Sequence, residues 1–376
     1  MTSRTTALAV FALAAAAAGC GGSSGKTGTL SLHLVDGPGD FQEINLHVLE
    51  VRVNGPGGWT TLSRPDQTWD LLTLRGGVIA TLAAGVPLPA GDYSQVRLLL
   101  GAGNTVRLAD GTLQDLQVPS GLRSGLKIVC PTHVGAGAAQ DVFIDFDGAR
   151  SIFLHGTGAG SWILRPVVRC QEKAAAGAIS GTLTTLETEV SAPLAGAAVT
   201  AQVLDAGGSP TVIRTATTGA DGRYLLDLLP LGATYYVVTQ PVVGTASYAA
   251  RASGPLALSA AAPAQAFDVA YAQRAPSGSI AGAITPAATA DDADEVAAVQ
   301  PLDAGGTTRR LVVRTTSGAV ASGAEGYAMP GLPAGGYSLA VTRRTLSGTT
   351  ETVTAGAPRD ATVAAGATTT LDLAVP

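Results

Sequence analysis

The second half of the chain contains one sequence pattern twice, and this internal repeat constrains the fold more than any other feature. Each copy opens with a Gly-rich apolar segment, continues through a Leu-Asp-Ala-Gly-Gly turn and reaches a Leu-Pro-x-Gly turn. The repeated pairs are 177–184 with 278–285, 204–208 with 302–306, and 229–232 with 332–335. Three matches in the same order predict two copies of one domain.

The repeated segments carry strand and turn signals. Patterns such as Tyr-x-Leu and Val-x-Val give each strand one apolar face, and Asp-Gly and Ala-Gly pairs supply the positive φ that hairpins need. The chain holds 48 glycines and 21 prolines, and no long stretch beyond the first 20 residues has helical apolar spacing. We therefore expect an all-β protein built from sandwiches or barrels.

Charge excludes some partners. The formal net charge is −5 for 376 residues, a weak acidity that points away from nucleic acid and from anionic lipid surfaces. No His-Glu-x-x-His motif is present, and a glycine-rich stretch at 156–160 lacks the context of a dinucleotide site. We expect no cofactor.

Residues 177–272 resemble the carboxypeptidase-regulatory-like modules, which are transthyretin-like seven-stranded sandwiches of bacterial surface proteins. The resemblance rests on the Ile-x-Gly opening strand, the stretch 193–197, the Ala-Asp-Gly-x-Tyr hairpin at 220–224 and the Leu-Pro-x-Gly turn. It implies a spacer or adhesive element without catalytic residues.

Residues 278–376 form a second, more divergent copy. Glu325 replaces the hairpin aspartate, and the acidic run 291–295 replaces the Pro-Leu-x-Gly-Ala stretch. This run lacks the spacing and the central glycine of a calcium loop, so we expect a solvated acidic loop. Seams in composition at 171–176 and 273–277 separate the three folded segments.

The amino terminus resembles a bacterial lipoprotein signal. Arg4 precedes an apolar run over 7–18, too short to span a bilayer of about 30 Å as a helix, and Ala18-Gly19 precede Cys20. The resemblance implies removal of 1–19, lipidation of Cys20 and anchoring in the cell envelope, with the outer membrane favoured because Gly21 follows. The alternative is an ordinary cysteine after a secretory signal. Residues 20–27 form a predicted flexible tether.

Residues 28–170 resemble an uncharacterised domain family found near the lipidated end of bacterial envelope proteins. The matching stretches are 28–32, 36–40, 70–74, 85–93, 145–147 with Arg150, and 164–169. We expect a β-sandwich or barrel-like domain, and the family resemblance carries no functional residue.

Apolar residues in this segment alternate along the predicted strands. Leu30, Leu32 and Leu34 are expected to point inward, and strands are also expected at 96–100, 142–146 and 162–168. In a long strand the inward positions are Ile44, Leu46 and Val48, followed by Leu49, Val51 and Val53. The change of parity between Val48 and Leu49 predicts a β-bulge.

Besides Cys20, the chain contains two cysteines, Cys130 and Cys170. In an oxidising compartment an even pair indicates a disulfide. The alternative is a pair of free buried thiols.

Three aspartates, Asp141, Asp145 and Asp147, share one face of a predicted strand and are weak candidates for a calcium site or a carboxylate dyad. Arg165 and Arg169 share a face of the last predicted strand of this segment, so cross-strand ion pairs explain the same residues.

The histidines and tryptophans offer two further candidate sites. A zinc site would need three or four converging ligands, whereas His33 and His47 are expected to face solvent; His133 and His155 are the other two histidines. Trp59, Trp69 and Trp162 are candidates for a sugar-stacking platform, with burial in the core as the alternative.

We therefore expect a lipid-anchored cell-envelope protein that is not an enzyme and that acts in binding, adhesion or envelope architecture. Its partners would be the membrane, through the lipid, and a protein or carbohydrate ligand. One alternative is an enzyme or accessory subunit that acts on envelope glycans. Another is a passive spacer.

Overall fold

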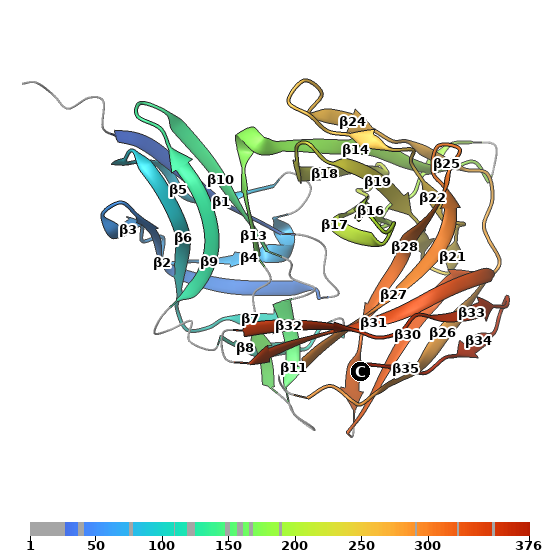
Figure 1. Ribbon diagram of the computed structural model, residues 1–376. Helices are drawn as coiled ribbons and strands as arrows, with labels where there is room; N and C mark the ends of the chain where they lie inside the picture. Colours follow the sequence, from blue (N-terminus) through green and yellow to red (C-terminus); the bar gives the residue numbers. More distant parts are fainter. Residues whose placement is uncertain are drawn as a thin grey trace, which may run out of the picture.

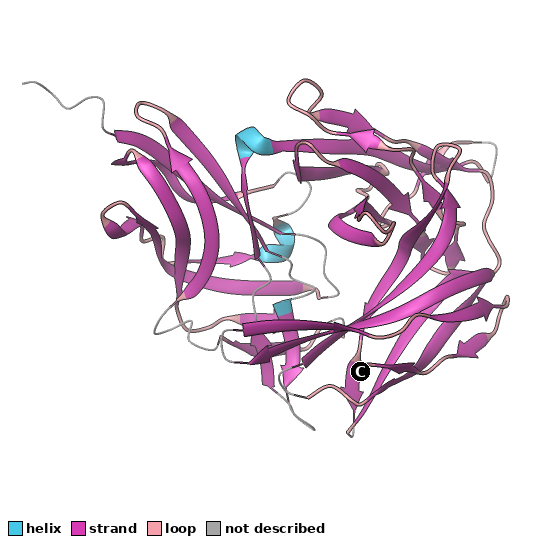
Figure 2. Cartoon of the chain, viewed as in Figure 1, coloured by secondary structure: helices cyan, strands magenta, loops and turns pink. Residues whose placement is uncertain are grey.

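The computed structural model describes residues 27–36, 41–74, 78–108, 110–118, 125–146, 151–155, 161–164, 168–187, 190–289, 292–321, 323–347 and 350–376. These residues form an all-β protein, as predicted, in which the short 3-10 turns η1 (Leu71–Thr73) and η2 (Lys173–Ala175) accompany the strands (Figure 2). Three parts follow one another along the chain (Figure 1). We call them the N-terminal domain, the middle module and the C-terminal module.

The N-terminal domain contains two sheets. One has the order β13-β10-β1-β5, and the other has the order β11-β12-β8-β7-β2-β6-β9, with β3 and β4 also paired to β2. The strands are β1 (Thr27–Asp36), β2 (Glu43–Gly55), β3 (Gly58–Ser63), β4 (Gln67–Asp70), β5 (Ala80–Pro89), β6 (Gly91–Leu100), β7 (Thr105–Arg107), β8 (Leu113–Gln117), β9 (Leu126–Val134), β10 (Ala139–Phe146), β11 (Ile152–His155), β12 (Ser161–Leu164) and β13 (Val168–Glu172).

The predicted alternation places the core between these sheets. Leu30, Leu32 and Leu34 are each at most 1% exposed. The predicted bulge in β2 is confirmed, because Val48 pairs with Leu100 whereas Glu50 pairs with Leu99. The inserted residue is Leu49, which is 39% exposed. The prediction that Leu49 points inward was therefore wrong: the bulge absorbs the parity change by turning this side chain out.

The single strand predicted over 162–168 is two strands. β12 pairs with β11 and β8 in the larger sheet, whereas β13 pairs with β10 in the smaller sheet. The two strands thus belong to different sheets. Apolar alternation could not reveal this, because it is the same in both sheets.

The middle and C-terminal modules are sandwiches of two sheets with equivalent topology. In the middle module the sheets join β14 with β18, β24 and β25, and β16 with β17, β19, β22 and β23. Its strands are β14 (Ala176–Thr185), β15 (Ala192–Pro193), β16 (Ala198–Leu204), β17 (Pro210–Thr217), β18 (Arg223–Pro230), β19 (Thr234–Thr239), β20 (Val242–Val243), β21 (Ala246–Ser247), β22 (Arg251–Ala252), β23 (Leu256–Ala257), β24 (Ala264–Ala266) and β25 (Val269–Tyr271).

The C-terminal module repeats this arrangement: β26 pairs with β30, β34 and β35, and β27 and β31 pair with each other and with β28, β32 and β33. Its strands are β26 (Ser277–Thr285), β27 (Asp292–Asp303), β28 (Thr308–Ser317), β29 (Ala319–Ala321), β30 (Ala324–Pro333), β31 (Gly335–Ser347), β32 (Thr350–Ala355), β33 (Arg359–Val363), β34 (Thr368–Thr370) and β35 (Leu373–Ala374). The predicted duplication is thus a duplication of fold.

The two modules also share individual hydrogen bonds. The hydroxyl of Tyr224 donates to the carbonyl of Phe267 at 2.6 Å, and that of Tyr327 donates to the carbonyl of Leu371 at 2.7 Å. Both carbonyls lie against a glycine of the opening strand, where a Cβ on Gly181 or on the glycine at 282 would come within about 2 Å. The small residue of each opening strand is therefore required by this close backbone approach.

A buried tyrosine closes the Leu-Pro-x-Gly turn in all three parts of the chain. In each case the phenol donates a hydrogen bond to the carbonyl of the proline in that turn. The pairs are Tyr93 with Pro89 at 2.7 Å, Tyr235 with Pro230 at 2.8 Å, and Tyr337 with Pro333 at 2.7 Å. Burial raises the pKa of each phenol, so the hydroxyl remains a donor at neutral pH.

Candidate functional site

The expected lipidation site, Cys20, lies outside the described residues, as do the rest of the signal and most of the predicted tether. In the described part of the chain, no helix is long and apolar enough to cross a membrane.

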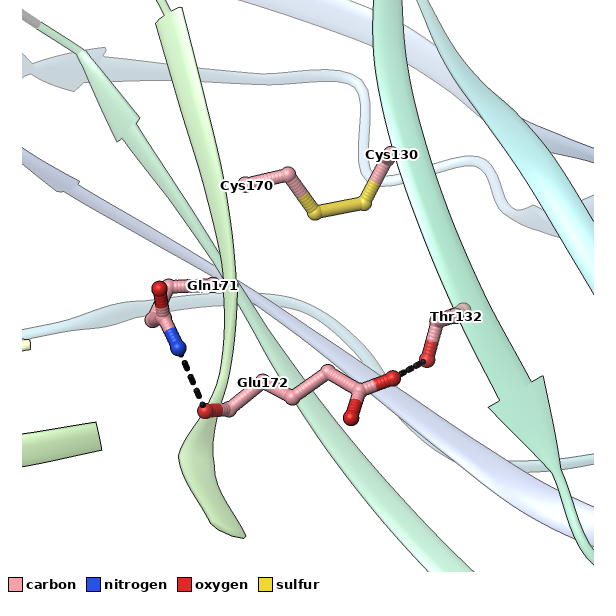
Figure 3. Close-up of a disulfide and its surroundings, with 5 residues drawn as sticks. All are labelled: Cys130, Thr132, Cys170, Gln171 and Glu172. Atoms are coloured by element: carbon pink, nitrogen blue, oxygen red, sulfur yellow. Dashed lines mark hydrogen bonds between the residues drawn. A yellow bond between two sulfur atoms is a disulfide. The ribbon is translucent and has the colours of Figure 1, made fainter. Parts of the chain in front are cut away.

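Cys130 and Cys170 form a disulfide that joins β9 to β13 (Figure 3). The two cysteines are 40 positions apart in sequence, and their Cα atoms are 5.2 Å apart. Nearby, the hydroxyl of Thr132 donates to the Glu172 carboxylate at 2.5 Å. The disulfide and this hydrogen bond connect the edge of the larger sheet to the last strand of the smaller one.

The three candidate aspartates do not form a metal site among the described residues. Asp141 lies 3.5 Å from His33, Asp145 forms an ion pair with Arg214 of the middle module, and Asp147 lies outside the described residues. No group of three or more potential metal ligands occurs in the described segments. Arg165 also lies outside them, whereas Arg169 stands opposite Asp145 in the β10–β13 register.

Arg214 connects the N-terminal domain to the middle module. Its guanidinium pairs with Asp145 on β10 and with Asp227 on β18, 2.7 Å away, and its side chain is only 8% exposed. Burial opposes its charge, but the two carboxylates outweigh burial, so the pKa of Arg214 is raised. Arg169 on β13 donates a second bond across the same junction, to the carbonyl of Ile213. Asp145 therefore serves a junction between domains.

The histidines on β2 and β1 point away from the core but are largely covered. The His33 ring stacks on Phe143 with centroids 4.9 Å apart, and its side chain is 13% exposed. The Nε2 of His47 lies 2.9 Å from a carboxylate oxygen of Asp66, and its Nδ1 lies 3.0 Å from the carbonyl oxygen of Ala102. The expectation of freely exposed strand histidines was thus too simple, because Phe143 of the neighbouring strand covers His33 and the loop residues Asp66 and Ala102 contact His47.

The three tryptophans have different environments. Trp69 and Trp162 are partly buried against the domain core, and Trp162 meets Phe41 edge to face at 5.7 Å. Trp59 is 37% exposed. On β2, Trp59 stands opposite Asn54 and Trp69 opposite Leu46. Eight residues of strand separate these positions by about 26 Å. The structure therefore does not unite Trp59 and Trp69 in one platform.

The acidic run of the C-terminal module is not a solvated loop, and that prediction was wrong. β27 begins at Asp292, and the side chain of Asp294 is 0% exposed. Arg343 on β31 pairs with it through two hydrogen bonds, Nε to Oδ1 at 2.8 Å and Nη2 to Oδ2 at 2.6 Å. Burial is possible because the bidentate guanidinium neutralises the carboxylate.

Two more carboxylates surround Arg343. Glu325 lies 3.4 Å and Asp292 3.9 Å from its guanidinium. Burial raises the pKa of Glu325 to about 7, and the neighbouring Asp294 adds to this shift although the backbone N–H of Ala288 opposes it. Burial also raises the pKa of Asp292, but hydrogen bonds from Thr345 and the backbone N–H of Thr289 outweigh it and leave that pKa lowered. Glu325 thus titrates near neutral pH beside Asp292, whose lowered pKa keeps it charged there.

A carboxyl group titrating near neutrality is often a sign of acid–base chemistry. Here the four side chains of the cluster are at most 9% exposed, so a substrate has no access to them. The cluster fixes β27, β30 and β31 together. The sequence did mark the residues of this cluster, because Glu325 and the acidic run are the two places where the second copy departs from the first. The sequence analysis did not predict that they contact each other.

The middle and C-terminal modules share an interface of buried residues. Tyr236, Val238, Ala304 and Leu311 form one apolar cluster across it. The side-chain amide of Gln202, on a fully buried residue, donates to the carbonyl of Val312 at 2.6 Å and accepts from its N–H at 2.9 Å. We call this pair of hydrogen bonds the amide fork. Because one side-chain amide both donates to and accepts from the same backbone residue, the fork is directional and fixes the position of one module relative to the other.

Solved structures with some similarity include a Bacillus anthracis protein and two pilins. The Bacillus anthracis TIE protein is 13% identical, with a TM-score of 0.21, and the match covers 93% of this chain and 51% of that chain. The chain therefore spans about half the length of that protein. The minor pilin GBS52 of Streptococcus agalactiae is 12% identical, with a TM-score of 0.19, over 53% of this chain and 95% of that chain.

BcpA, the major pilin subunit of Bacillus cereus, is 11% identical, with a TM-score of 0.18, over 93% of this chain and 99% of that chain. No curated protein matches the sequence. Residues 27–166, which comprise most of the N-terminal domain, match the family described as "Domain of unknown function (DUF4382)".

Proposed function

We propose that this protein is a lipid-anchored architectural element of the bacterial cell envelope, in which three β domains extend from the membrane as one continuous body. The observation that carries the proposal is the pair of hydrogen bonds between Gln202 and Val312, buried at the junction of the two modules. A chain of independent domains would not bury a polar side chain at such a junction, because separation would expose its partners and cost both bonds.

The junction with the N-terminal domain supports the same function. β13 ends at Glu172, η2 occupies the next three residues, and β14 begins at Ala176. The connection therefore contains no free linker, and Arg214 ties Asp145 to the middle module from the side. The middle module thus contacts both neighbours, an arrangement suited to holding a fixed shape.

The anchor part of the proposal is tested with Cys20→Ala and, as a control in the predicted tether, Ser24→Ala. Detergent phase partitioning of cell lysates should place the natural protein and Ser24→Ala in the detergent phase and Cys20→Ala in the aqueous phase. Each buried methylene of an acyl chain contributes about 0.8 kcal/mol to membrane binding, so the loss should be nearly complete. Retention of Cys20→Ala in the detergent phase would remove the anchor from the proposal.

The architectural part is tested by small-angle X-ray scattering of the purified full chain in detergent-matched solvent. One fixed arrangement of the three parts should fit the scattering of the natural protein. Gln202→Ala, which breaks the fork at the module junction, should broaden the distribution of domain arrangements. A natural protein whose scattering requires many arrangements would contradict the proposal.

A further inference from the structure

The outward face of strands β3, β2, β6 and β9 carries a row of side chains that the architectural role does not use. The strand registers place Trp59 opposite Asn54, Asn54 opposite Gln95, and Gln95 opposite Val129. Four side chains thus form one line across four strands, about 14 Å long at the usual strand spacing. Val129 is 76% exposed.

Trp59 stacks on Arg97 at this face. The guanidinium carbon of Arg97 is 4.1 Å from the centre of the indole ring, and the Nε of Arg97 is buried without a hydrogen-bond partner. Arg97 therefore occupies one face of the indole. Trp59 as a whole is 37% exposed, so we take the other ring face as the one available to a ligand. An aromatic ring held in this way is a stacking surface for the apolar face of a sugar ring.

The polar groups next to the indole are unengaged. In the part of the chain that the structure describes, the side-chain amides of Asn54 and Gln95 hydrogen-bond to no protein group. Each amide offers a carbonyl acceptor and two N–H donors side by side, a pattern that matches neighbouring hydroxyl groups on a sugar.

The charge of this face is opposite to that of the whole chain. The next row, in register, holds Arg52, Arg97 and Lys127. The hydrogen bond from Arg52, together with one from Thr61, lowers the pKa of Glu50 to about 2, so this carboxylate stays charged and neutralises Arg52. Among the described residues, no carboxylate pairs with Arg97 or Lys127. The row therefore has an excess of positive charge in a protein of net charge −5.

Charged residues lie at both ends of this face. Arg64 adds a further positive charge, 3.2 Å from Glu50, and Asp92 at the far end pairs with His133 at 2.7 Å. Trp59, Lys127 and Val129 are all exposed in the full chain, with both modules in place. This face is therefore accessible in the assembled chain.

We infer that the outward face of β3, β2, β6 and β9 binds a polysaccharide that contains uronic acid residues. A uronate combines the features that the face recognises. Its pyranose ring stacks on Trp59, its hydroxyls meet the amides of Asn54 and Gln95, and its carboxylate is attracted by Lys127 and Arg97. The inference is independent of the anchor at Cys20 and of the module junctions.

The test uses the purified full chain in detergent and two soluble probes, polygalacturonate and the neutral polymer dextran, in affinity electrophoresis. Polygalacturonate should retard the protein at 50 mM salt and much less at 300 mM salt, because screening weakens the charge contribution. Dextran should retard it at least tenfold less. No retardation by polygalacturonate, or equal retardation by dextran, would overturn the inference.

Variants locate the binding. Trp59→Ala should weaken retardation at least tenfold, Trp59→Phe should keep most of it, and Lys127→Glu should weaken it without removing a packing contact, because Lys127 is exposed. Val353→Ala, at a residue of the C-terminal module that is 63% exposed, is the matched control and should bind normally. Near-ultraviolet circular dichroism checks that each variant is folded. Normal binding by folded Trp59→Ala and Lys127→Glu would place the site elsewhere and refute the inference.

Discussion

Glu325 makes the C-terminal module sensitive to pH. Its side chain is 1% exposed, and its pKa in the folded protein is about 7 against an ordinary value of 4.5. Between these two pH values the folded state holds a proton on Glu325 that the unfolded state has released. The free energy of unfolding of this module should therefore fall as pH rises from 4.5 to 7 and then level off.

The expected size follows from the difference in pKa. A change from 4.5 to about 7 corresponds to about 3 kcal/mol of lost stability at pH 8 relative to pH 4.5. All four histidines of the chain precede residue 156, so no histidine of the C-terminal module titrates in this range. Glu325→Gln should remove the pH dependence, because a neutral amide can donate to Asp294 as the protonated carboxyl does.

The assay is hydrogen exchange of peptides from β27 and β31, measured between pH 5 and pH 8 and corrected for the intrinsic pH dependence of amide exchange. Protection in the natural protein should fall as pH rises, and protection in Glu325→Gln should stay level. Asp360→Asn, at an exposed carboxylate on β33, is the control and should behave as the natural protein does. Parallel profiles for the natural protein and Glu325→Gln would show that this carboxyl is not the titrating group.

Three further predictions concern the contacts between sheets and between domains. Replacing Cys130 and Cys170 by serine should destabilise the N-terminal domain by about 4 kcal/mol, the chain-entropy value for a loop closed over 40 positions; an unchanged urea midpoint of tryptophan fluorescence would contradict this. Arg214→Met should cost about 3 kcal/mol by removing the buried cation that Asp145 and Asp227 share, and adding Asp145→Asn should restore part of it in the same titration. Leu311→Ala, at a residue 0% exposed in the module interface, should cost about 2–5 kcal/mol by calorimetry, and a loss below 0.5 kcal/mol would show that this interface contributes little.

Local patterns predicted much of the fold because they act within one strand or one turn. The inward positions Leu30, Leu32 and Leu34 follow from the two-residue period of a strand, and the bulge beside Val48 follows from a break in that period. Three repeated segments in the same order likewise predicted two modules. The same reasoning misplaced Leu49, since a parity break marks a bulge but does not say which residue turns outward.

The candidate sites were less predictable, because their partners come from different strands. Trp59 and Trp69 are ten residues apart in sequence, yet β2 holds them far from each other. Conversely, Asn54 and Gln95 become neighbours of Trp59 only through the order β3-β2-β6 in the sheet. Strand order depends on loops and on packing of whole sheets, which a residue pattern does not contain.

The sequence by itself determined the class of the protein: period-two alternation makes strands, positive-φ turns make hairpins, and a duplicated pattern makes two like modules. Only the tertiary structure decided which charges are buried. Asp294, Glu325 and Arg343 belong to three strands from two sheets, and Asp145 and Arg214 belong to different domains. A charged side chain can be buried only where the fold brings an oppositely charged side chain next to it. This proximity depends on the tertiary structure and not on the local sequence.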